Sequence, residues 1–225
     1  MSDIINIAID GPAGAGKSTI AKKLAAKTGF IYVDTGAMYR ALTLYLMRKN
    51  IRPDDVAAIE QVLDDIDITL EYEDGMQIVK LNGENVNDKI RTQEIGLNTS
   101  TASKNKCVRT KLLSLQRNIA ATNNVIMDGR DIGSFVLPDA KVKIYLTASA
   151  SKRAYRRWLE LKEKGECGDV KQIEKEIIER DEQDMSRENS PLVQAPDAVL
   201  VDTSDMNIEQ VVDTLYEIYR RAANE

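Results

Sequence analysis

Two glycines, a lysine and a serine near the start of the chain have the spacing of a phosphate-binding loop. Gly11, Gly16, Lys17 and Ser18 fit G-x-x-x-x-G-K-[ST], between a β-branched run and a run with helical pattern. The glycines let backbone N–H groups turn inward around phosphate oxygens, and the helix that begins near Lys17 adds the positive end of its dipole. Lys17 would reach the β and γ phosphates, and the Ser18 hydroxyl would ligate Mg²⁺. A ligand-free glycine turn is the alternative, but the strand-loop-helix setting favours a nucleoside triphosphate.

The residues expected to contact this triphosphate are those of the loop and of the helical turn that follows. They are Gly11, Pro12, Ala13, Gly14, Ala15, Gly16, Lys17, Ser18 and Thr19. Motors, switches and kinases share such a loop, so the group that receives the phosphate must be inferred from other residues.

Arginines and acids follow the next two strand-like runs. Asp34 or Thr35 is expected to cap a helix that carries Arg40 about one turn in. The tetrapeptide DGRD, residues 128–131, follows the third run. Ligands of open parallel sheets bind at the carboxyl ends of strands, so these residues are candidates for a second ligand site. A turn held by an Arg-Asp pair is the alternative for the tetrapeptide.

Three charged residues share one face of a predicted helix near the C-terminal end. Arg180, Asp184 and Arg187 stand at i, i+4 and i+7 in VKQIEKEIIERDEQDMSR. Taken alone, this spacing favours a solvated row of salt bridges over a binding site.

A further arginine group follows the fourth strand-like run. Arg153, Arg156 and Arg157 lie in KRAYRRWLELKEKG, where Arg153 and Arg157 share a helix face. A basic surface helix and a functional site are about equally favoured, and Trp158 is expected to pack in a core. Guanidinium groups after several strands could nevertheless converge on one negatively charged space, as phosphoryl transfer between two nucleotides requires.

The elements that must position these residues alternate between strands and helices. Five short β-branched runs (INIAID, IYVD, VIMDG, VKIYLTA and AVLVDT) are separated by helical patterns, which predicts an α/β fold with a parallel sheet covered on both faces. Residues 35–98 break this rhythm. There, ITLEYEDGMQIVKLNG alternates apolar and polar residues around Asp74-Gly75, which predicts a hairpin in a small inserted antiparallel lobe.

Composition excludes several classes of protein. The 225 residues contain no histidine, which removes imidazole bases and histidine-ligated metals. A net charge of −5 argues against nucleic acid as a partner, and no segment is apolar enough to suggest a membrane span. Met1–Asp10 lacks the order of a secretory signal, so a cytoplasmic protein is expected. Cys107 and Cys167 are expected to be reduced rather than paired or metal-bound.

Together the motifs resemble one family. GPAGAGKS, DTGAMYR, RTQEI through Ser100 and Arg109, DGRDIG and ERDEQDMSRENSPL follow in the order found in bacterial cytidylate kinases, over essentially the whole chain. The resemblance implies a five-stranded P-loop kinase core in residues 1–34, 99–150 and 169–225. It also implies a nucleotide-binding insert in residues 35–98 and a short helical lid in residues 151–168.

The resemblance further implies transfer of the γ-phosphoryl group of ATP, bound with Mg²⁺, to CMP or dCMP in pyrimidine nucleotide metabolism, by a monomer. Arg40, Arg130 and Arg187 look like the clamp on the CMP phosphate. Ser100, Arg109 and Asp131, with Thr35 nearby, look like readers of cytosine, and Arg180 and Asp184 look like contacts to the sugar. The implied catalytic residues are Lys17, Arg130, Arg153 and Arg157.

Two other functions remain open. A kinase acting on UMP or on a non-nucleotide anion would share the loop and the clamp but would not need the sugar pair. A P-loop switch that binds a protein partner would need neither DGRD nor the clamp.

No general base is required for phosphoryl transfer to a phosphate, which agrees with the absence of histidine.

Overall fold

The computed structural model describes residues 4–73, 76–163, 165 and 168–224. It contains a five-stranded sheet with the strand order β2-β6-β1-β7-β8, and the pairs of β1 with β6, β1 with β7, and β7 with β8 are parallel. The strands are β1 (Asn6–Asp10), β2 (Ile31–Asp34), β6 (Val125–Asp128), β7 (Val142–Thr147) and β8 (Val199–Asp202). All five β-branched runs are therefore strands, and the predicted α/β class is confirmed.

The chain divides into two compact units. Unit 1 comprises Met1–Phe30 and Asn123–Glu225, and unit 2 comprises Ile31–Thr122. Unit 2 contains all of the predicted insert, residues 35–98. The functional boundaries of core, insert and lid remain predictions.

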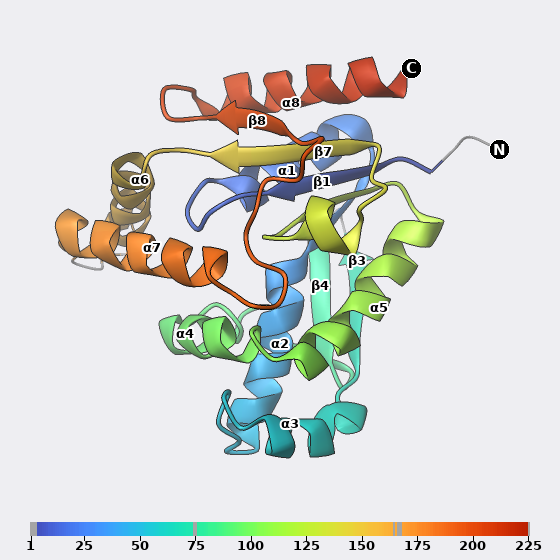
Figure 1. Ribbon diagram of the computed structural model, residues 1–225, viewed down its shortest axis with the longest axis vertical. Coiled ribbons are helices and arrows are strands. Elements are labelled where there is room, and N and C mark those ends of the chain that lie inside the picture. The colour runs from blue at the N-terminus through green and yellow to red at the C-terminus, as the bar shows by residue number, and fades with distance from the viewer. Residues whose placement is uncertain (1–3, 74–75, 164, 166–167, 225) are drawn as a thin grey trace. The chain divides into compact units, whose positions relative to one another are not determined.

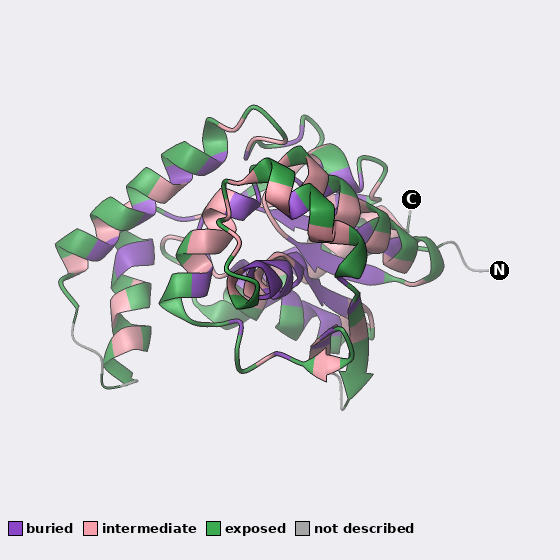
Figure 2. Ribbon diagram, turned by 90° about the horizontal axis from the view of Figure 1, so that it is seen from below, coloured by how far each residue is buried: buried purple, intermediate pink, exposed green. Residues whose placement is uncertain are grey.

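Unit 1 surrounds its strands with helices (Figure 1). Its helices are α1 (Lys17–Thr28), the π-helical turn η2 (Ile132–Val136), α6 (Ala150–Glu163), α7 (Val170–Met185) and α8 (Ile208–Ala223). Residues 7–9 of β1 and 125–127 of β6 are fully buried. Such continuous apolar runs are typical of strands covered on both faces, and Figure 2 shows the buried strands among helices with exposed outer faces. Helix α6 packs along α7, and α1 packs along α8.

Unit 2 combines helices with a three-stranded antiparallel sheet and also includes β2. Its other elements are α2 (Thr35–Arg48), α3 (Val56–Val62), the 3₁₀ turn η1 (Leu63–Asp65), β3 (Ile68–Glu73), β4 (Met76–Leu81), β5 (Glu84–Asn85), α4 (Gln93–Ala102) and α5 (Lys106–Thr122). Strands β3 and β4 pair from Ile68 with Leu81 to Glu73 with Met76, as the predicted hairpin requires. Its turn, Asp74-Gly75, lies outside the described residues.

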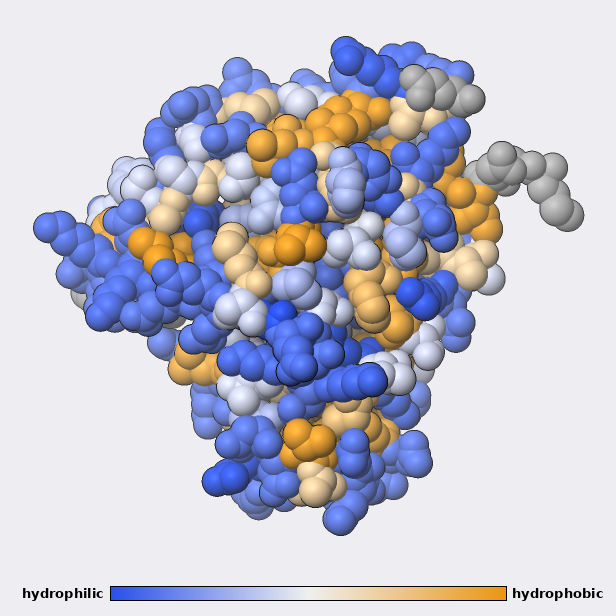
Figure 3. All heavy atoms as spheres, in the orientation of Figure 1, coloured by the Kyte–Doolittle hydropathy of each residue, from blue (hydrophilic) through white to orange (hydrophobic). Residues whose placement is uncertain are grey.

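The face of the molecule drawn in Figure 3 is mainly polar. No helix in residues 4–73, 76–163 or 168–224 is long and apolar enough to cross a membrane. Hydrophobic residues gather along β8 on the face drawn in Figure 3, where Val199 and Leu200 are exposed. Cys107 is a free thiol, and Cys167 lies outside the described residues.

Candidate active site

The glycine-rich loop joins β1 to α1 with a geometry that only glycine allows at its first position. Gly11 has φ 146°, and a Cβ there would lie 2.0 Å from the carbonyl oxygen of Leu146. Gly16, directly before α1, has φ 86°, in the left-handed region that other residues avoid. The two glycines of the motif are therefore required by the backbone itself.

Lys17 is buried at the start of α1. Its Nζ donates hydrogen bonds of 2.7 Å to the carbonyl oxygens of Gly11 and Pro12. Burial lowers the pKa of Lys17 well below its ordinary value, and the positive charge of Arg130 adds to this shift. The negative charges of nearby acids oppose it. Since a bound phosphate would favour the charged ammonium, this lysine is suited to hold an anion in the loop.

The Ser18 hydroxyl and the Asp128 carboxylate form an oxygen pair next to the phosphate loop. The Ser18 hydroxyl donates to Asp128 Oδ2 at 2.8 Å, at the end of β6. Hydroxyl and carboxylate oxygens suit Mg²⁺, which takes few protein ligands when phosphates supply the others. Within the described ranges no group of three or more acidic, cysteine or histidine residues could hold a metal alone. The pair therefore fits Mg²⁺ that is bound together with a triphosphate.

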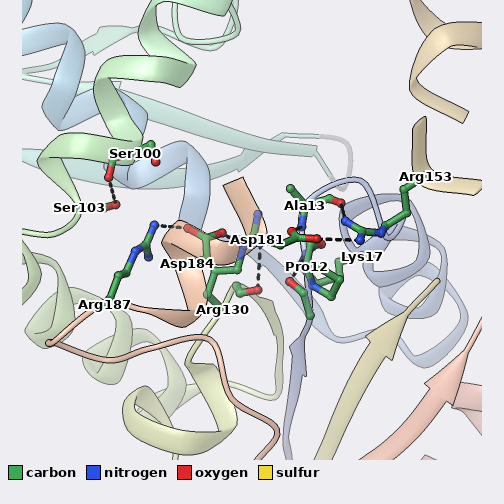
Figure 4. Close-up of polar contacts among 12 residues, drawn as sticks. Pro12, Ala13, Lys17, Ser100, Ser103, Arg130, Arg153, Asp181, Asp184 and Arg187 are labelled. Atoms are coloured by element: carbon green, nitrogen blue, oxygen red, sulfur yellow. Dashed lines mark hydrogen bonds and ion pairs between the residues drawn. The ribbon is translucent and has the colours of Figure 1, made fainter. Parts of the chain in front are cut away.

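The middle of the loop is fastened to α6 and α7 (Figure 4). Arg153 Nη1 donates to the carbonyl oxygen of Ala13 at 2.7 Å, and the Ala13 N–H donates to Asp181 Oδ1 at 3.2 Å. Arg153 and Asp181 also form an ion pair of 2.7 Å, and both are buried. A solvated surface helix, one interpretation of the arginine run, is therefore wrong for Arg153. Asp181 was not predicted, because nothing local distinguishes it from the other acids of α7.

The other members of the arginine run have different surroundings. Arg156 donates to the carbonyl oxygen of Thr203 at 2.6 Å, whereas Arg157 is exposed and pairs with Glu160 at 3.1 Å. Trp158 packs against the small core of Ala154, Ile173 and Ile177, and its indole N–H donates to the carbonyl oxygen of Gly168. The predicted packing role of Trp158 is confirmed.

Asp184 joins two of the predicted acceptor-site arginines. Its Oδ2 accepts from Arg130 Nε at 2.8 Å, and its Oδ1 accepts from Arg187 Nη2. Burial opposes its charge, but Arg130, Arg187 and Arg180 together lower the pKa of Asp184 below its ordinary value. Only 1% of Asp184 is exposed, so the solvated salt-bridge row that the spacing favoured is wrong. Two guanidinium groups therefore bind this carboxylate, and the charge of Arg180 also acts on it.

The loop that carries Arg130 and Asp131 is bound to the end of β1. The carboxylate of Asp10 accepts the N–H groups of Ile132 and Gly133, each at 2.7 Å. Burial raises the pKa of Asp10 to about 6, although these two hydrogen bonds oppose the shift. Sequence reasoning missed Asp10, whose only local signal is an acid at the end of an otherwise apolar strand.

Unit 2 carries the remaining predicted residues on three helices that pack together. Thr35 and Arg40 lie on α2, Ser100 on α4 and Arg109 on α5. Asp34 caps α2 by accepting the N–H of Ala37 at 2.9 Å, which decides between the two predicted caps.

Two arginines of unit 2 are fixed by their neighbours. The guanidinium of Arg40 lies 4.0 Å from Asp34 Oδ1. That of Arg109 is buried, 5.8 Å from the ring centroid of Tyr39, and donates to the carbonyl oxygen of Ser103.

These features define the class of the protein. A phosphate loop after the first strand of a parallel sheet, with a buried lysine and several arginines around strand ends, is the apparatus of a P-loop kinase. Solved structures share the fold. A shikimate kinase from Bacteroides thetaiotaomicron, 14% identical, has a TM-score of 0.50 with 97% of this chain and 99% of its own covered. An uncharacterised protein from Eubacterium ventriosum, 13% identical, also scores 0.50, with 95% of this chain and 96% of that chain covered.

Sequence comparison defines the family. Residues 7–221 match the family model for cytidylate kinase. The chain is 52% identical to the cytidylate kinase of Caldicellulosiruptor saccharolyticus over 96% of this chain and 95% of the relative. It is 46% identical to that of Shouchella clausii over 98% of both. The chain belongs to the cytidylate kinase family and is accordingly a phosphotransferase of the CMP kinase class.

Proposed function

We propose that the chain transfers the γ-phosphoryl group of ATP to CMP or dCMP, giving ADP and CDP or dCDP, in pyrimidine nucleotide metabolism. The observation that carries this proposal is the pairing of the buried Asp184 with Arg130 and Arg187 in a chain of the cytidylate kinase family. Sequence pattern alone would assign these three positions to a surface helix or to a turn. Their side chains instead bind one another and are only slightly exposed to solvent. Positive charge gathered in this way suits a phosphate-bearing acceptor.

The donor half of the proposed site is the phosphate loop. ATP would contact Gly11, Pro12, Ala13, Gly14, Ala15, Gly16, Lys17, Ser18 and Thr19. Ser18 would hold Mg²⁺, with Asp128 accepting a hydrogen bond from its hydroxyl. When bound, the ion neutralises charge on the phosphate oxygens. Lys17 would exchange its carbonyl partners for phosphate oxygens, where its charge counts most as the γ-phosphoryl group leaves.

The acceptor half of the proposed site rests on the resemblance to the cytidylate kinase family. CMP would contact Thr35, Arg40, Ser100, Arg109, Arg130, Asp131, Arg180, Asp184 and Arg187. Arg40, Arg130 and Arg187 would bind its phosphate, and Ser100, Arg109 and Asp131 would read cytosine. Asp184 would contact the sugar with Arg180 while orienting Arg130 and Arg187, since one carboxylate binds both guanidinium groups.

Catalysis then rests on position and charge. Lys17, Arg130, Arg153 and Arg157 would stabilise the transferring group, and fixing both substrates is worth roughly 7 to 11 kcal/mol. Arg153 binds the loop through Ala13, so its effect includes shaping the donor site, whereas Arg157 is exposed. We further propose that residues 151–168 act as a lid that excludes water. Residues 164, 166 and 167 of this segment lie outside the described residues.

A substrate panel tests the proposal. ADP formation from ATP and Mg²⁺ is measured with CMP, dCMP, UMP, AMP and GMP, with Lys17→Ala as the control for contaminating kinases. We expect kcat/KM for CMP and dCMP to exceed that for UMP, by up to roughly 10⁴-fold, because a buried polar site rejects an analogue that leaves its groups unpaired. Equal rates with UMP and CMP would overturn the base-reading assignment. ATP hydrolysis without any acceptor would favour a P-loop switch.

We also expect the enzyme to be a cytoplasmic monomer.

A further inference from the structure

Two consecutive residues of β1 bind the acceptor-site loop on either side of Arg130 and Asp131. Before the pair, the N–H of Gly129 donates to the carbonyl oxygen of Ile9 at 3.0 Å. After it, the N–H groups of residues 132 and 133 donate to the two carboxylate oxygens of Asp10. The strand that leads into the phosphate loop therefore also holds the loop that carries two predicted CMP contacts.

The contact with Asp10 is close and almost fully buried. Only 4% of Asp10 is exposed, and both hydrogen bonds are 2.7 Å long. At Gly133 a Cβ would lie 3.4 Å from Asp10 Oδ2 and 3.3 Å from the side chain of Lys143, so a larger residue would press on both. Burying a carboxylate is costly, and a merely structural turn does not require one. The charge gives the two N–H bonds more strength than a neutral acceptor would.

We propose that Asp10 is a positioning residue of the CMP site, which fixes the loop of Arg130 and Asp131 through the backbone of residues 132 and 133. The inference rests on the proposed function, because the CMP contacts of Arg130 and Asp131 belong to it. Arg130 also reaches Asp184 at 2.8 Å, so the placement of this loop sets the geometry of the arginine cluster. Asp10 thereby couples the end of the donor strand to the acceptor.

A second role for Asp10 is distinguishable. Its charge also acts on Lys17, favouring the ammonium form. If Asp10 served Lys17 alone, its replacement would weaken ATP binding or lower kcat and leave CMP binding by the ATP-free enzyme unchanged. A positioning role in the acceptor site predicts instead that CMP binding by the ATP-free enzyme weakens and that ATP binding stays nearly unchanged.

The test is Asp10→Asn, which keeps the shape but turns one acceptor into a donor that faces an N–H group. Calorimetry on the full chain measures Kd for CMP without ATP, and Kd for a non-hydrolysable ATP analogue with Mg²⁺. We expect Kd for CMP to rise at least about tenfold and Kd for the analogue to change less than about threefold. Asp55→Asn, a change in the carboxylate that caps α3, is the matched control and should leave both unchanged.

A double-mutant cycle shows whether the effect passes through the loop. In the background Arg130→Ala with Asp131→Ala, adding Asp10→Asn should change Kd for CMP less than about twofold. Gly133→Val tests the same contact from the loop side with the carboxylate in place, and should also weaken CMP binding if Asp10→Asn fails to fold. Unchanged CMP binding in folded Asp10→Asn or Gly133→Val, or additive effects in the cycle, would overturn the inference. If the wild type does not bind CMP, or Arg130→Ala binds it normally, the proposed function fails instead.

Discussion

Arg153 and Asp181 form a buried ion pair of 2.7 Å, and both residues also bind the main chain of Ala13 in the phosphate loop. The pair joins α6, α7 and the loop, which are separated by up to 168 positions in the sequence. The base of the proposed lid is therefore fixed to the donor site by two side chains. A change in either residue should therefore affect both the stability of the protein and the shape of the donor site.

Asp181→Ala should strongly destabilise the protein. It leaves the Arg153 guanidinium buried without its carboxylate, and breaking a buried pair in this way costs about 3 to 5 kcal/mol. The free energy of unfolding is measured by urea denaturation. Asp213→Ala, which removes an exposed pair with Lys27, is the control and should change it by no more than about 1 kcal/mol. Equal effects of the two substitutions would show that the Arg153 pair contributes no more than a surface pair.

Arg157→Ala should separate catalysis from stability. If this exposed arginine meets the transferring phosphoryl group, kcat falls at least about 10²-fold. CMP binding and the free energy of unfolding should stay unchanged, because its partner Glu160 is also exposed. Steady-state kinetics, CMP calorimetry and urea denaturation measure the three quantities. Unchanged kcat would show that Arg157 is part of a solvated surface helix and that other groups meet the charge.

The sequence predicted the features that depend on neighbouring residues. The phosphate loop, the five strands and the hairpin arms are set by local glycine, β-branched and alternating patterns, and each is found where expected. The turn chemistry explains this success, because residue 11 has a φ that only glycine adopts readily.

The sequence could not identify side chains whose partners are distant along the chain. Asp10 lies 122 positions from Ile132, and no local pattern shows that the end of β1 meets that turn. Helical spacing placed Arg153 and Asp184 on helix faces, but the choice between solvent and burial depends on packing. Both side chains are buried, so the surface interpretation, which spacing favoured for Asp184 and left open for Arg153, is wrong for them.

Lys17→Ala should nearly abolish turnover and leave a cooperatively folded protein. The ammonium supplies charge that matters most in the transition state, whereas in the structure it donates to the carbonyl oxygens of Gly11 and Pro12. Lys23→Ala, an exposed change on the same helix, is the matched control and should retain activity. Single-turnover rates and thermal melting are measured together. Wild-type turnover in Lys17→Ala would contradict the phosphate-loop role.

Asp184→Ala should raise KM for CMP by one to two orders of magnitude and leave KM for ATP nearly unchanged. It removes the carboxylate that holds Arg130 and Arg187, and hydrogen bonds to charged groups are worth about 1.5 to 3 kcal/mol. Because the pKa of Asp184 is lowered in the folded protein, its ionised form stabilises the fold. This stabilisation is present above pH 3.8, the ordinary pKa, and is lost as the pH falls through the pKa in the folded protein. Steady-state kinetics near neutral pH are measured for Asp184→Ala and for the matched variant Asp184→Asn, which removes only the negative charge. Unchanged CMP kinetics in both variants would exclude a role of Asp184 in the acceptor site.

Asp10 should give the stability of the wild type a distinct pH dependence relative to Asp10→Asn. Burial raises its pKa from 3.8 to about 6, with Asp131 adding to the rise and Lys17 opposing it. The folded protein therefore binds the proton more tightly than the unfolded chain. The stabilisation is fully present below pH 3.8 and is lost as the pH rises through about 6.

The neutral variant Asp10→Asn lacks this titration. The free energy of unfolding of the wild type should therefore increase relative to that of the variant as the pH falls from 7.5 to 4.5. The increase should not exceed about 3 kcal/mol, which corresponds to the difference between the folded and unfolded pKa values. Urea denaturation across this range measures the difference, with Asp55→Asn to correct for groups elsewhere in the chain. A difference that stays constant with pH would mean that Asp10 titrates near 3.8 and that burial does not control its charge.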